Sequence, residues 1–265
     1  MAESVCSRSD IYLCEDWDDK TGRPIVNGWD NNWTVYPPNN NSPVVDETFG
    51  YQSGQALRLI VPPSSLGGDN AKATGHVRNF CVIPEGDSGA SVHARWYLYF
   101  SSGFVFNPGG GGAKLFYIHA LDGPAVWRVR FSYIYNGADT TRAIIHVDFN
   151  GGSEINPNIN TTLLTSGQWY LVEVMIKVNT PGVANGEVRW WVDEVLNGEL
   201  LNQLVRGTST DLVDGITIDG FFGGIEVNEH PQQYVWYDNI VVSSQYIGPL
   251  VVPTSLVVTQ RRMLI

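Results

Sequence analysis

The stretch KLFYIHALDGPAVWRVRFSYIYNGADTTRAIIHVD, residues 114–148, decides the fold. Apolar and polar side chains alternate along much of it, and this period of two is typical of β-strands. Asn136 and Gly137 form a dipeptide that favours a tight hairpin turn. The stretch therefore predicts three β-strands, of which the last two, 127–135 and 142–149, flank the turn.

Basic side chains and histidines gather in the same stretch, although the chain as a whole is acidic. The formal net charge is −11 and the sequence pI is about 4.8, with 16 Lys and Arg in 265 residues. If the strands are neighbours, Arg128, Arg130, His146 and Asp148 share one face of a sheet. We expect this local positive charge to meet an anionic carbohydrate. The acidic balance argues against nucleic acid, because a nucleic-acid-binding domain usually shows a basic face and a high pI.

Strand patterns recur about every 8–15 residues from position 11 to position 244, and helical periodicity is almost absent. The 28 Gly and 14 Pro supply turns between the strands. This spacing predicts an all-β sandwich or jelly roll. We predict a single domain over 1–248 and a C-terminal arm over 249–265. Residues 187–201 are predicted to form one bent strand.

The first ten residues, MAESVCSRSD, have neither a basic n-region nor an apolar h-region and are not expected to form a signal peptide. The sequence contains no run of about 18 apolar residues, so no membrane span is predicted. We expect an extracellular or virion-surface location, with a signal removed or another route out of the cell. The three cysteines allow a Cys6–Cys14 bridge, a Cys14–Cys81 bridge or three reduced thiols, and their spacing does not indicate zinc.

A second stretch, GQWYLVEVMIKVNTPGVANGEVRWWVDEVLNG over 167–198, resembles the C-terminal half of concanavalin-like jelly-roll polysaccharide lyases of the alginate- and glucuronan-lyase-like families. Those families carry a Trp-x-x-x-Glu strand, an Asn-Thr-Pro-Gly turn and a Gly-x-x-x-x-Trp-Val-Asp strand. The matching positions are Trp169, Glu173, Asn179, Thr180, Pro181, Gly182, Gly186, Trp191, Val192 and Asp193. ARWYLYFSSGFVFNPGGGGAKLFYI (94–118), FFGG (221–224) and YDNIVV (237–242) extend the resemblance over about 90–244. It implies an all-β, concanavalin-like jelly-roll sandwich of two antiparallel sheets.

The resemblance also implies a cleft in which a Gly-Gly-Lys lysine and an arginine on the next strand meet the sugar. Lys114 takes the lysine position, and Arg128 or Arg130 the arginine position. The Tyr-x-Tyr pair of those families is missing from the strand after the hairpin, where AIIHVDF (143–149) places His146 instead.

Elimination on a uronate requires that the carboxylate be neutralised, the C5 proton removed and the leaving oxygen protonated. Lys114, Arg130 and His146 are the predicted catalytic residues. The predicted substrate-binding residues are Arg128, Arg95, Tyr97 and Tyr99, of which the tyrosines qualify only if their strand lines the groove.

Other polar residues are interpreted structurally. His119 is expected to be a hydrogen-bonded core histidine. The Glu-x-Asp-x-x-Glu strand of retaining hydrolases on this fold is absent from the sequence, and Glu173, Asp193 and Glu194 are expected at the surface.

The resemblance to jelly-roll carbohydrate modules also implies a structural calcium ion, because hard carboxylate oxygens suit Ca²⁺. The predicted ligands are Glu15, Asp16 and Asp238, with Asp18 beside them. The alternative interpretation is a solvated acidic turn.

Two functions follow from these patterns. The first is a glycan-binding or surface-displayed structural module, such as a virion decoration protein, with 249–265 contacting an identical subunit or a capsid or surface partner. The missing Tyr-x-Tyr pair favours it. The alternative is a polysaccharide lyase that cleaves an anionic uronate polymer, favoured by Lys114 and the arginines; a glycoside hydrolase is the least supported class.

Overall fold

The computed structural model describes residues 5–18, 33–36, 43–52, 54–61, 63, 76–79, 91–106, 113–120, 127–135, 140–149, 162–222 and 230–249. Within these ranges the chain consists of β-strands and one short 3₁₀ helix, η1 (Val5–Ser7). In the same ranges, no helix is long and apolar enough to cross a membrane. The predicted all-β class is confirmed.

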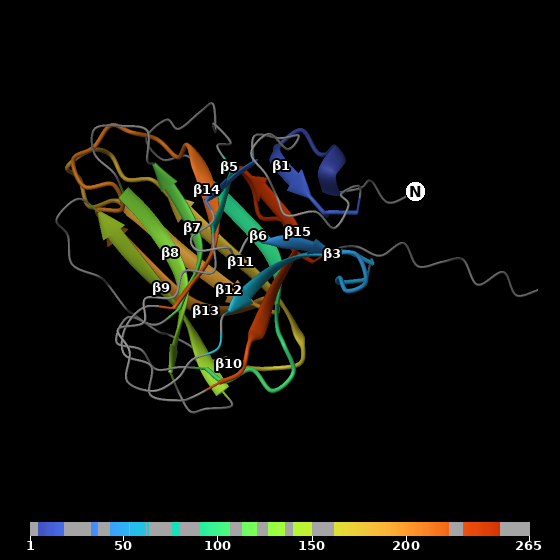
Figure 1. Cartoon of the computed structure of the whole chain (residues 1–265). Helices are drawn as coiled ribbons and strands as arrows, with labels where there is room; N and C mark the ends of the chain where they lie inside the picture. The colour runs from blue at the N-terminus through green and yellow to red at the C-terminus, as the bar shows by residue number, and fades with distance from the viewer. Residues whose placement is uncertain are drawn as a thin grey trace, which may run out of the picture.

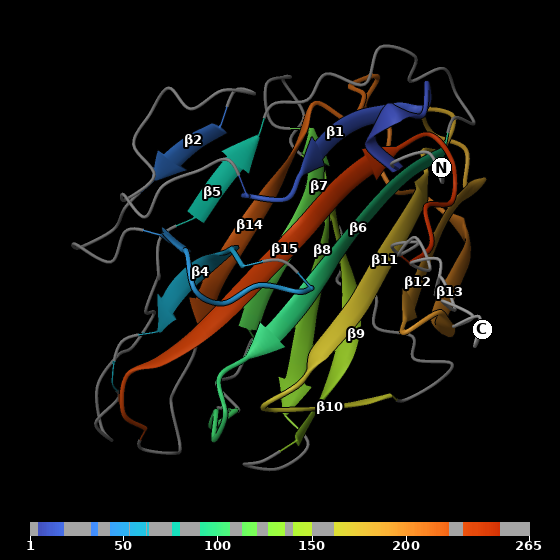
Figure 2. The same cartoon turned by 90° about the vertical axis from the view of Figure 1, so that its right-hand side faces the viewer.

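The strands form two antiparallel sheets (Figure 1). The eight-stranded sheet has the order β13 (Val195–Gln203), β12 (Gly186–Val192), β11 (Trp169–Lys177), β6 (Ser91–Phe100), β15 (Gln233–Ser243), β4 (Ala56–Val61) and β3 (Val44–Asp46), with β1 (Ile11–Glu15) also paired to β15. The seven-stranded sheet has the order β10 (Leu163–Thr165), β9 (Thr140–Phe149), β8 (Trp127–Tyr135), β7 (Ala113–Ala120), β14 (Gly215–Phe222), β5 (His76–Asn79) and β2 (Trp33–Tyr36). In Figure 2, β15, β6 and β11 lie in front of β7, β8 and β9, so the two sheets form two layers.

Alternating side chains of both sheets fill the space between the layers. On β6, Trp96 is fully buried and stacks on Phe116 of β7, with ring centroids 3.9 Å apart. Phe131 of β8 meets the same indole edge-on. Aromatic contacts of this kind add to the free energy of burial, so this cluster joins the sheets at the centre of the sandwich.

Gly198 on β13 is required by the packing of a buried tryptophan. It lies opposite Trp190 of β12 in the ladder, and Trp190 is fully buried. A Cβ atom on residue 198 would overlap the six-membered ring of that indole. The indole therefore uses the space that a side chain would occupy in a regular strand.

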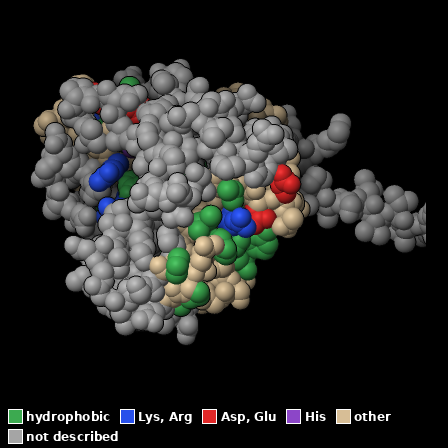
Figure 3. Space-filling view, viewed as in Figure 1, with side chains coloured by type: hydrophobic (Ala, Val, Ile, Leu, Met, Phe, Trp, Pro, Cys, Tyr) green, Lys and Arg blue, Asp and Glu red, His purple; other side chains and the backbone are tan. Residues whose placement is uncertain are grey.

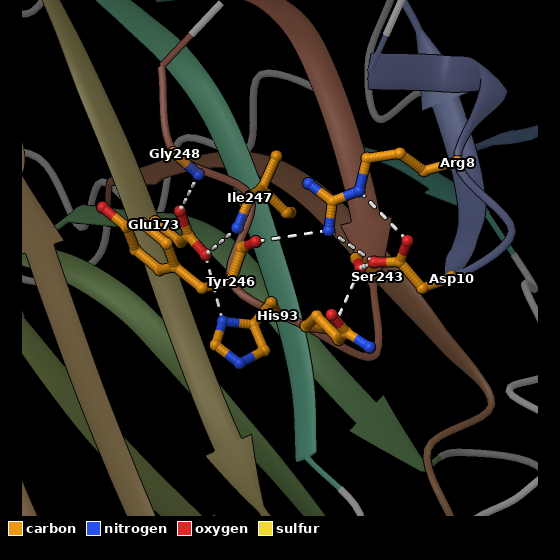
Figure 4. A network of polar contacts seen from close by, with 9 residues as sticks. Arg8, Asp10, His93, Glu173, Ser243, Tyr246, Ile247 and Gly248 are labelled. Atoms are coloured by element: carbon orange, nitrogen blue, oxygen red, sulfur yellow. Dashed lines mark hydrogen bonds and ion pairs between the residues drawn. The ribbon is translucent and has the colours of Figure 1, made fainter. Parts of the chain in front are cut away.

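Both ends of the described chain are held on the eight-stranded sheet. A disulfide joins Cys6 of the η1 helix to Cys14 of β1; Cys81 lies outside the described residues. The Arg8 guanidinium holds the pKa of Asp10 well below its usual range, at about 2, and the hydroxyl of Ser243 on β15 donates to the same carboxylate. These contacts tie the N-terminal segment to the end of β15 (Figure 4).

The carboxylate of Glu173 on β11 binds the backbone of the segment that follows β15. It accepts hydrogen bonds from the backbone N–H groups of Ile247, at 2.9 Å, and Gly248, at 3.0 Å. His93 Nδ1 lies 3.0 Å from the same carboxylate (Figure 4). Glu173 is 2% exposed, so the expectation that it lies at the surface is wrong. An acid is tolerated there because several groups hydrogen-bond to it.

Replacing Glu173 with glutamine is expected to loosen residues 246–248. The substitution removes the charge and turns one acceptor oxygen into an NH₂ group, which faces a backbone N–H. We expect a loss of about 2 kcal/mol in the free energy of unfolding and faster hydrogen exchange at the Ile247 and Gly248 amides. The matched control is Glu194→Gln, since Glu194 is exposed in the β12–β13 turn. Equal exchange rates in the two variants would contradict the assignment.

Candidate active site

Strand β8 presents its arginines on the outer face of the seven-stranded sheet. Trp127, Val129 and Phe131 point into the core, so Arg128 and Arg130 alternate with them on the other face. The ladder with β9 places Arg130 opposite His146 and Arg128 opposite Asp148. The backbone register therefore puts the four predicted neighbours on one face; the side chains of β9 lie outside the described part of the chain.

A β-bulge brings Lys114 to this face. Tyr117 of β7 lies opposite Arg130 of β8, and Lys114 lies opposite Ser132. Lys114 and Tyr117 are three positions apart on β7, whereas Arg130 and Ser132 are only two positions apart on β8. The extra residue is Leu115, and both Leu115 and Phe116 are buried in the core. Without it, Lys114 would point into the core, because a shift of one residue exchanges the faces of a strand.

Tyr117 and Asp219 are functional candidates that sequence reasoning missed. Tyr117 is 6% exposed and is hydrogen-bonded to the carboxylate of Asp219 on β14. Burial raises the pKa of Tyr117 far above its usual value, and the charge of Asp219 adds to the rise. The guanidinium of Arg128 lies 5.4 Å from the centre of the Tyr117 ring. Tyr117 is thus a proton-bearing hydrogen-bond donor at neutral pH.

Tyr117 and Arg130 lie opposite each other on neighbouring strands and form part of a row of residues across the sheet. Tyr117 lies opposite Thr217 of β14, and Thr217 lies opposite Arg78 of β5. With Arg130, Arg78 adds a second arginine position to this row of the ladder. In Figure 3, Lys and Arg side chains (blue) reach the surface on the side where β7 and β8 lie in Figure 1. Lys114, Arg128, Arg130 and Arg78 thus occupy neighbouring backbone positions of this sheet.

His119 is held by two partners, as expected for a structural histidine. Its Nδ1 lies 2.9 Å from Asp214, and its Nε2 lies 2.9 Å from the hydroxyl of Thr217. The ring is 1% exposed. His119 lies on the outer face of the seven-stranded sheet, opposite Arg128 in the ladder, and so next to the row that contains Tyr117 and Thr217.

Three of the predicted substrate-binding residues lie elsewhere. Arg95, Tyr97 and Tyr99 are on β6, in the eight-stranded sheet, and on its outer face. Arg95 donates to two backbone carbonyls, and Tyr97 is stacked under Tyr51 at a centroid distance of 3.6 Å. Tyr99 packs against Phe49. The core of the sandwich separates these residues from Lys114, so the condition that their strand line the same groove is not met.

Asp238 is a fully buried member of the predicted set of calcium ligands. Its buried carboxylate accepts two backbone N–H groups at 2.6 and 2.7 Å. Burial raises the pKa of Asp238 to about 8, and the charges of Asp18 and Asp16 contribute. Among the described residues, no three His, Cys, Asp or Glu side chains gather closely enough to hold a metal ion. Calcium at Glu15, Asp16 and Asp238 stays a prediction.

Comparison with known proteins agrees with this architecture. Residues 140–240 match the model of a family described as Polysaccharide lyase 14. A search of curated proteins by sequence finds no match. The sequence resemblance to jelly-roll polysaccharide lyases is confirmed by the family match and by similar solved structures.

Three solved structures illustrate the shared fold. A mutant of the alginate lyase Aly36B, in complex with alginate trisaccharide, is 17% identical with a TM-score of 0.62, covering 88% of this chain and 98% of that one. The endo-β-1,4-glucuronan lyase of the fungus Trichoderma reesei is 14% identical with a TM-score of 0.53, covering 90% and 96%. The alginate lyase vAL-1 from Chlorella virus is 16% identical with a TM-score of 0.54, covering 81% and 93%. The fold is therefore a jelly roll of the kind seen in polysaccharide lyases.

Proposed function

We propose that this chain is a polysaccharide lyase that cleaves an anionic, uronate-containing polysaccharide by β-elimination. The observation that carries the proposal is the β-bulge at Leu115, which places Lys114 on the same face as Arg130 and Tyr117. The family match over 140–240 and the fold of the similar lyases support this class over the non-catalytic module.

The chemistry assigns a role to each group. Arg130, with Arg128 beside it, pairs with the substrate carboxylate, and this stabilises the negative charge that develops when the C5 proton leaves. We assign to Lys114 and His146 the acceptance of that proton and the return of one to the leaving oxygen. The C5–H and C4–O bonds break, a C4–C5 double bond forms, and the leaving sugar departs as an alcohol.

Tyr117 has a different role in this scheme. Its raised pKa keeps the phenol protonated at neutral pH, which argues against a role as the base. Its one O–H proton is donated to Asp219, which holds the hydroxyl in place, so toward the substrate the Tyr117 oxygen acts as an acceptor.

The test is to incubate the protein with each of a panel of polymers and to measure ultraviolet absorbance over time, because the new C4–C5 double bond absorbs in the ultraviolet. We expect a rise with at least one uronate polymer, such as alginate or glucuronan, and none with a neutral glucan as the control. A chain that binds a uronate polymer but never produces the absorbing product would contradict the proposal.

The second candidate function is a non-catalytic module that binds the same class of glycan. The strand 142–149 favours it, because it lacks the Tyr-x-Tyr pair of the similar lyases. Binding without elimination across the panel is the outcome that would select it. The extracellular or virion location, and the partner contacts of 249–265, stay predictions.

A further inference from the structure

A tyrosine of the eight-stranded sheet reaches through the core to the bulge behind Lys114. Tyr237 on β15 is fully buried. Its hydroxyl lies 3.0 Å from the carbonyl oxygen of Leu115 on β7 and 3.0 Å from that of Asp219 on β14. Both acceptors belong to the seven-stranded sheet, so this single hydroxyl links the two layers of the sandwich.

The two carbonyls lie where the ladders around β7 are irregular. Between β7 and β8, Leu115 has no counterpart, so β7 carries one extra residue. Between β14 and β7, Asp219 and Gly220 together face Leu115, so here β14 carries the extra residue. Regular ladder bonds are interrupted at such points, and the single O–H proton of Tyr237 is shared between the carbonyls at both interruptions.

The two bulges beside Tyr237 affect how residues on the outer face of the seven-stranded sheet are placed relative to one another. Lys114 precedes Leu115, Tyr117 follows it by two residues, and Asp219 belongs to the other bulge. The relative placement of the lysine, the phenol and its carboxylate partner therefore depends on these two adjacent backbone irregularities. A buried carbonyl that loses its donor costs free energy, so the backbone is expected to readjust if the Tyr237 hydroxyl is removed.

We propose that Tyr237 is a positioning residue, which fixes the paired bulges of β7 and β14 and thereby the spacing of Lys114 from Tyr117 and Arg130. The proposal rests on the proposed lyase function for its catalytic consequence, and on the geometry alone for its structural one. It also gives a physical reason for the tyrosine of the YDNIVV segment: a phenylalanine would fill the same space but would hold neither carbonyl.

The test compares Tyr237→Phe with Tyr170→Phe. Tyr170 is also buried, and its hydroxyl accepts the backbone N–H of Thr165 at 2.7 Å, on strands away from the bulges. Both variants lose one hydroxyl and are expected to melt at similarly lowered temperatures. Only Tyr237→Phe is expected to exchange amide hydrogens at least tenfold faster in 113–120 and 215–222.

Only Tyr237→Phe is also expected to lower kcat, by tenfold or more, with KM changed less than threefold. Small displacements of reacting groups have effects of this size. Exchange rates in the two segments equal to those of Tyr170→Phe would overturn the proposal. So would faster exchange with an unchanged kcat.

The lyase proposal and the proposal for Tyr237 can be refuted independently of each other. If the wild-type chain shows no elimination on any uronate polymer, the lyase function fails, and the exchange comparison alone decides whether Tyr237 holds the bulges. If Tyr237→Phe does not fold, the hydroxyl proton of Tyr237 in the wild-type chain is observed by NMR. A slowly exchanging proton near Leu115 and Asp219 supports the proposal, and a rapidly exchanging one overturns it.

Discussion

Replacing Lys114 with alanine is expected to lower the rate of elimination by at least about 100-fold while the chain still folds. The lysine is partly exposed on the outer face of the seven-stranded sheet, so its removal leaves no cavity in the core. The change removes the group to which we assign proton transfer beside the arginines. The measurement is the initial rate of absorbance increase on the uronate polymer that wild-type protein cleaves, together with the melting temperature.

The matched control is Lys177→Ala. Lys177 lies on β11 of the eight-stranded sheet and pairs with Glu187 at 3.1 Å. The same change in size and charge is therefore made on the opposite side of the sandwich, and we expect an almost unchanged rate. A Lys114→Ala variant as active as the control would show that Lys114 takes no part in the chemistry.

Replacing Gly198 with alanine is expected to lower the free energy of unfolding by about 3 kcal/mol or more. The added methyl group would overlap the ring of Trp190, which is buried on all sides and cannot move aside. For a chain of this size, such a loss corresponds to a fall of roughly 6–12 °C in melting temperature. Thermal and denaturant unfolding both measure it.

Two further variants make this prediction specific. Gly54→Ala is the control, because the nearest atom to a Cβ at that position is the Glu47 carbonyl oxygen, 3.7 Å away. In the double variant Gly198→Ala with Trp190→Phe, the smaller ring leaves room for the methyl group. We therefore expect the double variant to lose less stability than the sum of the single changes. Additive losses would show that the contact with the indole is not the cause.

The sequence predicted individual strands well and the arrangement of their faces less well. The strand 127–135 coincides with β8 because strict alternation leaves one way to bury its apolar side. The segment 187–201 is a hairpin instead of one bent strand, since Asp193 and Glu194 turn the chain with positive φ angles of 48° and 64°. Asp is common at the first position of such a turn, but Glu194 stands at the second position, where Gly is usual, so the sequence does not show the usual turn signal.

The candidate site shows the same limit. Alternation placed Arg128 and Arg130 together, but it does not tell which sheet a strand joins, so Tyr97 and Tyr99 were grouped with them. The sequence did not indicate Tyr117, because strict alternation would put it on the face opposite Lys114. The only sign of the bulge in the sequence is the adjacent apolar pair Leu115 and Phe116. Long-range contacts, such as that of Tyr237 with the bulge carbonyls, leave no local pattern.

The capture of Ile247 and Gly248 by Glu173 has a practical consequence for handling the protein. The chain leaves the sandwich from the outer side of the eight-stranded sheet, with the core between this exit and Lys114. A surface, bead or fluorescent label attached at residue 249, where the described chain ends, therefore lies on the side facing away from the proposed catalytic residues. Immobilisation through this end should leave the opposite side open to long polymers, whereas coupling through lysines puts Lys114 itself at risk.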